Sequence, residues 1–196
     1  LKTPLSGFFF GYICNNMNNN SREILNRKQI DIVIERLCHE LIENHFDFSN
    51  SVLVSLMPRG RYVGKKIHEK LETIINKRIK YGELDSSFYR DDLRKHSNPI
   101  VPHKMSMNLS VDEKNVVFID DVLFTGRSVR SAIDALMPFG RPKTIELLVL
   151  INRRLTRQLP IQPNYIGKEV DSIDSEKVVV SLDNKKNINS IKILKS

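Results

Sequence analysis

The chain has 196 residues, enough to bury the core of one domain, and its 40% hydrophobic and 7% aromatic content without tryptophan fits an ordinary α/β protein. Its 31 Lys and Arg residues against 23 Asp and Glu residues give a charge of +8, which favours phosphates or nucleic acid as ligands, although a solvated lysine-rich face gives the same balance. Two cysteines exclude a disulfide framework, and no apolar run has transmembrane length, so we expect a cytoplasmic protein.

The N-terminal region is polar and of low complexity, most clearly in Asn15–Ser21. We therefore expect residues 1–22 to form a disordered extension and residues 23–196 to form a single domain. The apolar run Gly7–Cys14 is short for a signal peptide. From Ile24 to Glu43, apolar residues recur at helical spacing, which predicts a long amphipathic helix.

Continuous apolar strands alternate with helices through the middle of the chain. Strands are predicted over Ser51–Met57, Val116–Ile119 and Thr144–Ile151, and helices over Arg61–Asn76 and Ser128–Met137. This alternation indicates the α/β class, with a central parallel sheet flanked by helices. Ligands in such sheets bind at the carboxyl ends of the strands.

Two other regions do not follow this alternation. The segment Ile79–Met107 predicts an antiparallel excursion and a long charged loop, which we interpret as a flexible lid. The segments Glu176–Leu182 and Ile191–Leu194 predict short strands that form a small C-terminal hood.

The most informative segment is Val116–Arg130, with the sequence VVFIDDVLFTGRSVR. Its strand ends in Asp120 and Asp121, and a polar turn then opens a helix, whose N-terminal N–H groups can hold an anion. Carboxylates suit ribose hydroxyls or a divalent metal, so a phosphorylated sugar fits both features. The same spacing also occurs where Asp ends a strand and Thr or Ser caps a helix.

The full string resembles the phosphoribosyl pyrophosphate (PRPP) motif of type I phosphoribosyltransferases, in which a hydrophobic strand, two acids and a Thr-Gly-x-Thr/Ser loop follow one another. The resemblance implies that Asp120 and Asp121 are catalytic, holding the ribose hydroxyls and indirectly helping a Mg²⁺ ion that is bound through the substrate. It also implies that the 5′-phosphate binds to a loop made of Val122, Leu123, Phe124, Thr125, Gly126, Arg127 and Ser128.

A second loop, Pro58-Arg59-Gly60, follows the first predicted strand. Gly60 lets the backbone approach a ligand closely, and Arg59 offers paired donors to a phosphate. On these residues alone, a plain turn with a solvent-facing arginine is equally compatible. Type I phosphoribosyltransferases carry their pyrophosphate-binding loop at this place, so the resemblance implies that Pro58, Arg59 and Gly60 bind pyrophosphate.

Two longer strings are similar to the PyrR family of pyrimidine-operon regulators and uracil phosphoribosyltransferases. They are YGELDSSFYRDDL at Tyr81–Leu93 and INRRLTRQLPIQPNYIGKEVDSIDSEKV at Ile151–Val178, and the similarity extends from about Asn26 to Lys192. The resemblance implies an enzyme that forms UMP and pyrophosphate from uracil and PRPP. It makes Arg90 a catalytic lid residue that reaches the pyrophosphate, although Arg90 also fits a charged exposed turn.

The same resemblance places base recognition in the C-terminal region. It implies that the base is bound by Arg153, Ile166, Gly167 and Lys168, whereas Arg153 by itself is also compatible with a surface charge. Asn152 stands where the family often has Asp, and Met57-Pro58 replaces a Lys-Thr pair, so these departures put activity in doubt more than the class of ligand.

PyrR proteins also bind the leader mRNA of the pyrimidine operon and promote attenuation when UMP is abundant. The resemblance therefore implies a UMP-sensing regulator, a homodimer or higher homo-oligomer, whose RNA-binding residues are Arg36, His39, Arg154 and Arg157. A structural helix histidine and a solvated arginine surface are the alternative interpretations. Two rival functions remain open: an RNA-binding regulator with weak or lost catalysis, and a phosphoribosyltransferase for another base.

Overall fold

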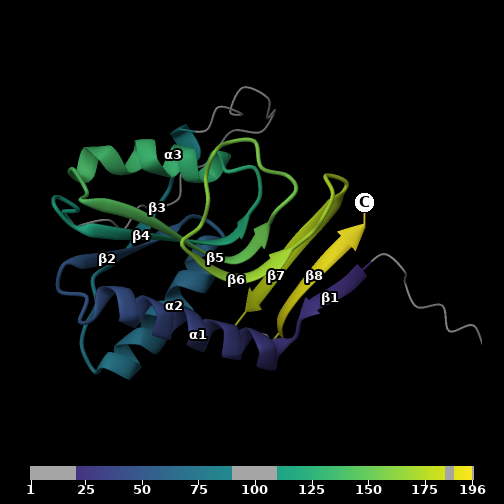
Figure 1. The fold of residues 1–196 in the computed structure, drawn as a ribbon, viewed down its shortest axis with the longest axis horizontal. Helices are drawn as coiled ribbons and strands as arrows, with labels where there is room; N and C mark the ends of the chain where they lie inside the picture. The colour runs from purple at the N-terminus through teal and green to yellow at the C-terminus, as the bar shows by residue number, and fades with distance from the viewer. Residues whose placement is uncertain (1–20, 90–109, 184–187, 196) are drawn as a thin grey trace, which may run out of the picture.

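The computed structural model describes residues 21–89, 110–183 and 188–195, and its centre is a five-stranded parallel sheet. The strand order is β3-β2-β4-β5-β6 (Figure 1), and each neighbouring pair is parallel. The strands are β2 (Ser51–Leu56), β3 (Tyr81–Leu84), β4 (Asn115–Leu123), β5 (Thr144–Arg153) and β6 (Tyr165–Val170). The predicted α/β class with a central parallel sheet is confirmed.

Helices cover both faces of this sheet (Figure 1). α1 (Arg27–His45) and α2 (Gly60–Ile75) lie on one face, and α3 (Arg127–Leu136), continued by a 3₁₀ turn at Met137–Phe139, lies on the other. Each face has its own core of buried apolar side chains. Alternate residues of one strand join different cores, as Val117 and Phe118 of β4 do, which explains why the strands are continuously apolar.

A smaller antiparallel sheet forms the hood, with the strand order β1-β8-β7. Its strands are β1 (Ser21–Leu25), β8 (Ile188–Lys195) and β7 (Glu176–Asp183). The hood shares the core that α1 and α2 cover, through Val178, Ile191 and Ile193. It is therefore packed against the rest of the domain. The predicted pair of C-terminal strands is confirmed.

The N-terminal boundary of the domain differs from the prediction. Ser21 and Arg22, expected in the disordered extension, pair with Leu194 and Ile193 of β8. Residues 1–20 lie outside the described residues. The first helix begins at Arg27 rather than near residue 24, because Asn26 caps it: its side chain accepts from the Gln29 N–H and its own N–H donates to the Gln29 side chain, both at 3.0 Å.

Two strands were predicted incorrectly. The segment after α2 was expected to be antiparallel, but β3 runs parallel to β2, as a strand–helix–strand connection requires. β4 was expected to end at Ile119, yet it continues through both acids to Leu123, because β5 extends to Arg153 and pairs with it. β6 was not predicted as a strand. The lid residues 90–107 lie outside the described residues.

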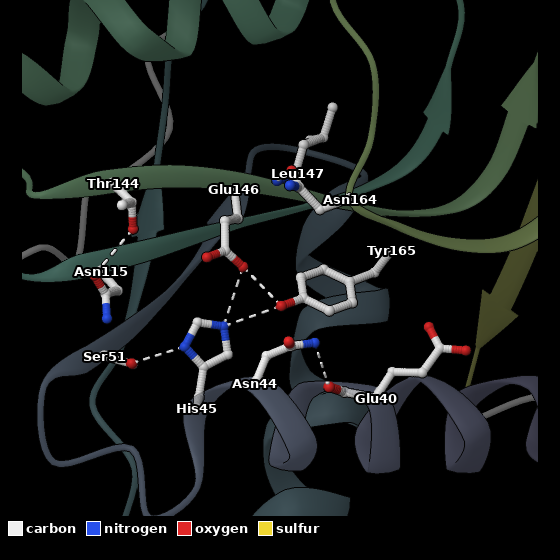
Figure 2. A network of polar contacts seen from close by, with 10 residues as sticks. All are labelled: Glu40, Asn44, His45, Ser51, Asn115, Thr144, Glu146, Leu147, Asn164 and Tyr165. Carbon is white, nitrogen blue, oxygen red and sulfur yellow. Dashed lines mark hydrogen bonds and ion pairs between the residues drawn. The ribbon is translucent and has the colours of Figure 1, made fainter.

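A buried polar network fastens α1 to the amino ends of the strands (Figure 2). The His45 ring at the end of α1 lies 2.9 Å from Ser51 Oγ and 3.2 Å from Glu146 Oε2. The Tyr165 hydroxyl donates to Glu146 at 2.7 Å, and its burial together with that carboxylate raises the pKa of Tyr165. These residues lie at the sheet edge opposite to the strand ends where a ligand is expected.

Candidate functional site

A cavity of about 650 Å³ opens at the carboxyl edge of the parallel sheet. Its walls come from the turns after β2 and β3, the end of β4, the first turn of α3, the end of β5 and the hood. The residues that were predicted to bind PRPP and that line it are Pro58, Arg59, Asp120, Asp121, Val122, Phe124 and Ser128. The predicted residues from the ends of β2 and β4 therefore meet at one edge, as the rule for parallel sheets predicts.

The two acids form the floor of this cavity. Asp120 Oδ1 accepts a hydrogen bond from the Asp121 N–H, and Asp121 Oδ1 accepts one from the Val122 N–H, both at 2.8 Å. Burial raises the pKa of both carboxyls; the charge of Asp121 raises that of Asp120 further, whereas Arg59 opposes the rise at Asp121. Two crowded carboxyls with raised pKa values favour a ligand that brings hydroxyl donors or a cation.

The loop after β2 is held directly against the acids. Arg59 precedes the first turn of α2, and the peptide between Met57 and Pro58 is cis. A Cβ atom at Gly60 would lie 2.4 Å from the Ile119 carbonyl oxygen and 3.0 Å from the Asp120 Cα. Only glycine allows this approach, so Gly60 places Arg59 and the N-terminus of α2 beside Asp120.

The predicted phosphate loop connects β4 to α3. Gly126 precedes the helix with a φ of 92°, a conformation that favours glycine, and the Arg127 N–H donates to Thr125 Oγ1 at 3.4 Å. Ser128 in the first turn of α3 lines the cavity. Leu123, Thr125, Gly126 and Arg127 do not line it, and the Leu123 side chain is buried in the core on the α3 side. The N-terminus of α3 thus lies at the same edge as the acids, where it favours an anion.

Arg153 lies in the cavity wall and is not a surface charge, since it is only 5% exposed. Its Nε donates to Ser172 Oγ at 2.7 Å and its Nη2 to the Ile173 carbonyl at 2.8 Å. The guanidinium also lies 4.0 Å from the centre of the Phe124 ring. Burial lowers the pKa of Arg153 from its usual value, but an arginine stays charged at neutral pH. The guanidinium therefore connects the phosphate loop to the segment that leads into the hood.

The other base-binding candidates do not line this cavity. Lys168 lies opposite Ile151 in the sheet, two positions before the point where Arg153 reaches the edge. The carbonyl oxygens of Ile166 and Gly167 each accept from Arg36 Nη2 at 2.8 Å, so they face α1. The structure separates Ile166, Gly167 and Lys168 from Arg153 because they belong to the body of β6 and not to its carboxyl end.

Several cavity residues were not predicted. Ser86 and Ser87 follow β3, where Asp85 Oδ1 accepts from the Ser87 N–H at 2.9 Å, and residues 174–178 enter from the hood. A parallel assignment of β3 would have placed Ser86 and Ser87 at the ligand edge. Nothing local in the sequence marks the hood residues, because their position depends on long-range strand pairing. Arg90 lies outside the described residues.

The four predicted RNA contacts surround β6 and the loop after β5. Arg36 binds Glu40 as well as the β6 carbonyls, and Arg154 donates to both Asp171 oxygens at 2.8 and 2.6 Å. Arg157 donates to the Phe124 carbonyl and to Asn152 Oδ1. His39 is exposed on α1. The three arginines thus have partners within the protein, while Arg36 and Arg154 remain about half exposed, as a solvated surface also allows.

Comparison with known proteins agrees with this geometry. The family model of the phosphoribosyl transferase domain matches residues 20–185. Hypoxanthine phosphoribosyltransferases of Staphylococcus aureus and Trypanosoma cruzi have similar structures, with TM-scores of 0.65 and 0.68 at 20% and 16% identity. The matches cover 91% and 89% of this chain and 94% and 91% of those chains. Fold and site together define a phosphoribosyl transferase domain.

Relatives found by sequence show which family of phosphoribosyl transferase domains the chain belongs to. Bifunctional protein PyrR of Bacillus subtilis strain 168 is 40% identical over 167 residues, which are 84% of this chain and 92% of that protein. Bifunctional protein PyrR of Clostridioides difficile strain 630 is 40% identical over 161 residues, 82% of this chain and 90% of that protein. The chain therefore belongs to the PyrR family, which confirms the resemblance of its two long strings.

No helix among residues 21–89, 110–183 and 188–195 is long and apolar enough to span a membrane. Within the same part of the chain, no group of three or more His, Cys, Asp and Glu side chains is arranged to hold a metal ion.

Proposed function

We propose that this chain transfers the phosphoribosyl group of PRPP to uracil and so forms UMP and pyrophosphate. The observation that carries the proposal is the one cavity in which the acid pair, the N-terminus of α3 and Arg59 meet. Carboxylates suit ribose hydroxyls, a helix N-terminus suits a phosphate group and an arginine suits pyrophosphate. Membership of the PyrR family supports uracil as the acceptor.

The chemistry needs electrostatic help more than a strong nucleophile. The bond from ribose C1′ to a pyrophosphate oxygen breaks and the oxygen keeps the electron pair. Uracil N1 bonds to C1′, and its proton passes to the departing pyrophosphate or to water. Positive charge develops on the sugar and is stabilised by the Asp120 and Asp121 carboxylates. Negative charge develops on pyrophosphate and is stabilised by Arg59. The 5′-phosphate, held at the α3 N-terminus, aligns C1′ with the base.

The acid pair also fits a magnesium ion that is shared with the substrate. Mg²⁺ prefers oxygen ligands and is commonly held by one or two carboxylates together with substrate phosphates. Asp120 and Asp121 supply that donor set in the cavity, and a bound cation would offset the repulsion that raises the pKa of Asp120. When bound, the ion would neutralise the leaving pyrophosphate. We further assign Arg90, from the resemblance, to the same pyrophosphate.

Base recognition is assigned to Arg153 and to the hood residues 174–178. Arg153 lies in the cavity wall next to the Phe124 ring, and a guanidinium can donate to a uracil carbonyl. The hood segment lines the same cavity, so its backbone groups can complete a pattern of donors and acceptors along one edge of the base.

A base-specificity assay tests this function. With PRPP and Mg²⁺ present, we expect kcat/KM for uracil to exceed that for hypoxanthine, guanine and orotate by at least about 10²-fold, because polar groups placed for one base stay unpaired with another. Product formation is measured by chromatography of the nucleotides. Preferred turnover of hypoxanthine or orotate would assign the chain to a different phosphoribosyltransferase.

A second function is regulation through RNA. The +8 charge and the predicted basic contacts around β6 support a nucleic-acid partner, and PyrR membership suggests the leader mRNA of a pyrimidine operon. We expect a leader hairpin to bind more tightly as UMP is added and more weakly as salt rises, since phosphate contacts release counterions. Gel-shift titrations measure both dependences, and the exposed His39 offers a variant, His39→Ala, that should weaken binding. An affinity independent of UMP would contradict this role.

A further inference from the structure

The loop after β5 lies against the outer side of the phosphate loop. We call residues 154–161 the bracing loop. The backbone N–H groups of Gln158 and Leu159 both donate to the Thr125 carbonyl, at 3.1 and 3.2 Å, and the Gln158 side chain accepts from Arg127 Nε at 2.9 Å. Where Gly126 lacks a side chain, the nearest atom of Ile161 would lie 3.3 Å from an added Cβ. The bracing loop thus contacts three successive residues of the phosphate loop.

Arg157 adds a contact to Phe124, the residue that precedes Thr125 in the phosphate loop. One nitrogen of its guanidinium donates to the Phe124 carbonyl, and Nη2 donates to Asn152 Oδ1 at 2.6 Å. Asn152 is buried near the carboxyl end of β5 and donates in turn to Glu169 Oε1 at 3.3 Å. A single charged group therefore ties the start of the phosphate loop to the body of the sheet. The Phe124 ring also contacts the Arg153 guanidinium, so arginines contact both the backbone carbonyl and the side chain of Phe124.

These contacts bear on how the loop receives an anion. A helix N-terminus binds phosphate through N–H groups whose directions are set by the preceding turn, here Thr125 and Gly126. The bracing loop bonds to the carbonyl groups of Phe124 and Thr125, whereas Phe124 and Ser128, on either side of the turn, line the cavity. A turn that is held in place before the ligand arrives loses less conformational freedom on binding.

We propose that Arg157 is a positioning residue for the 5′-phosphate: it fixes the phosphate loop from outside and does not touch the substrate. The proposal rests on the proposed function and deepens it. Arg157 was also predicted as an RNA contact; its bonds to Phe124 and Asn152 direct two of its nitrogens toward the phosphate loop and β5. The Arg157 guanidinium thereby connects the bracing loop to the loop that is proposed to bind the 5′-phosphate.

The test separates phosphate binding from base binding. For Arg157→Ala we expect KM for PRPP to rise about tenfold, as the loss of a charge-assisted hydrogen bond implies, while KM for uracil changes less than about twofold. Arg157→Lys, which keeps the charge but cannot span both acceptors, should give a smaller rise in the same KM. Arg130→Ala is the matched control, because Arg130 pairs with Asp134 one turn into α3 and is exposed. It should leave both KM values unchanged.

A second readout does not depend on turnover. Calorimetric titration with ribose 5-phosphate should show weaker binding in both Arg157 variants, with the larger loss in Arg157→Ala, and no change in Arg130→Ala. Equal rises in both KM values, or unchanged phosphate affinity in a folded Arg157 variant, overturns the positioning role. If Arg157→Ala melts below the assay temperature, Arg157→Lys carries the test. A wild-type protein that binds ribose 5-phosphate but makes no UMP would contradict the proposed function and leave this comparison valid.

Discussion

Replacing Asp120 and Asp121 together by asparagine should lower UMP formation from uracil and PRPP by at least about 10³-fold, since removing one well-placed electrostatic partner typically costs 10²–10³ in kcat. Both carboxylates lie on the floor of the cavity, and backbone N–H groups hold each of them in place. Asparagine keeps the shape and removes the charge that opposes the developing sugar cation. Steady-state assays at saturating uracil, with PRPP and Mg²⁺ varied, measure the loss.

The stability of this double variant separates a lost charge from a lost fold. Burial raises the folded-state pKa of both carboxyls above the ordinary value of 3.8, so the folded protein binds protons more readily than the unfolded chain. Wild-type stability therefore falls as pH rises from the ordinary Asp range through the raised pKa, and the asparagine variant escapes that fall. We expect equal or higher stability for the variant at neutral pH, measured by urea denaturation. Asp134→Asn, which removes one carboxylate from the exposed face of α3, is the control and should keep full activity. Retained turnover in the double variant would refute the site assignment.

The parts of the site that could be predicted are those that lie close together in the sequence. Asp120, Asp121 and the Thr125–Ser128 turn occupy nine consecutive residues, so strand, acids and helix N-terminus follow from one string. Arg59 could be added because it follows β2, another parallel strand, and the carboxyl ends of such strands meet at one edge. In both cases local sequence and one rule of sheet geometry were sufficient.

The parts that were missed depend on pairings between distant segments. Residues 174–178 reach the cavity because β7 pairs with β8, and β8 with β1 from the other end of the domain. The separation of Ile166–Lys168 from the cavity follows from the register of β6 on β5, which is set across residues 154–164 and not by local sequence. The bonds of Arg157 to the phosphate loop likewise join residues 33 positions apart. The charge run of this loop therefore did not reveal that Arg157 bonds to the phosphate loop.

Gly60→Ala should lower activity by displacing the backbone that carries Asp120. Alanine normally favours a helix over glycine by about 1 kcal/mol, but a Cβ here would lie 2.4 Å from the Ile119 carbonyl oxygen and 3.0 Å from the Asp120 Cα. Those atoms are backbone atoms of a central strand and cannot rotate away, so either β4 or the start of α2 must move. Overpacking of this kind costs about 1–3 kcal/mol of unfolding free energy. A shift near 1 Å at a reacting centre can lower the rate about 10²-fold.

We therefore expect Gly60→Ala to lower kcat/KM for PRPP by about 10²-fold and to lower the free energy of unfolding by about 1–3 kcal/mol. The activity is lost because the displaced backbone carries Asp120 and sets the position of Arg59, the two groups that face opposite charges in the reaction. Glu69→Ala introduces the same side chain on the exposed face of the same helix and should alter neither quantity by more than experimental error. Full activity in Gly60→Ala would mean that the close contact between α2 and β4 has no role in placing the acid pair. Loss of stability without loss of kcat/KM in the folded fraction would lead to the same conclusion, because it would confine the role of Gly60 to packing.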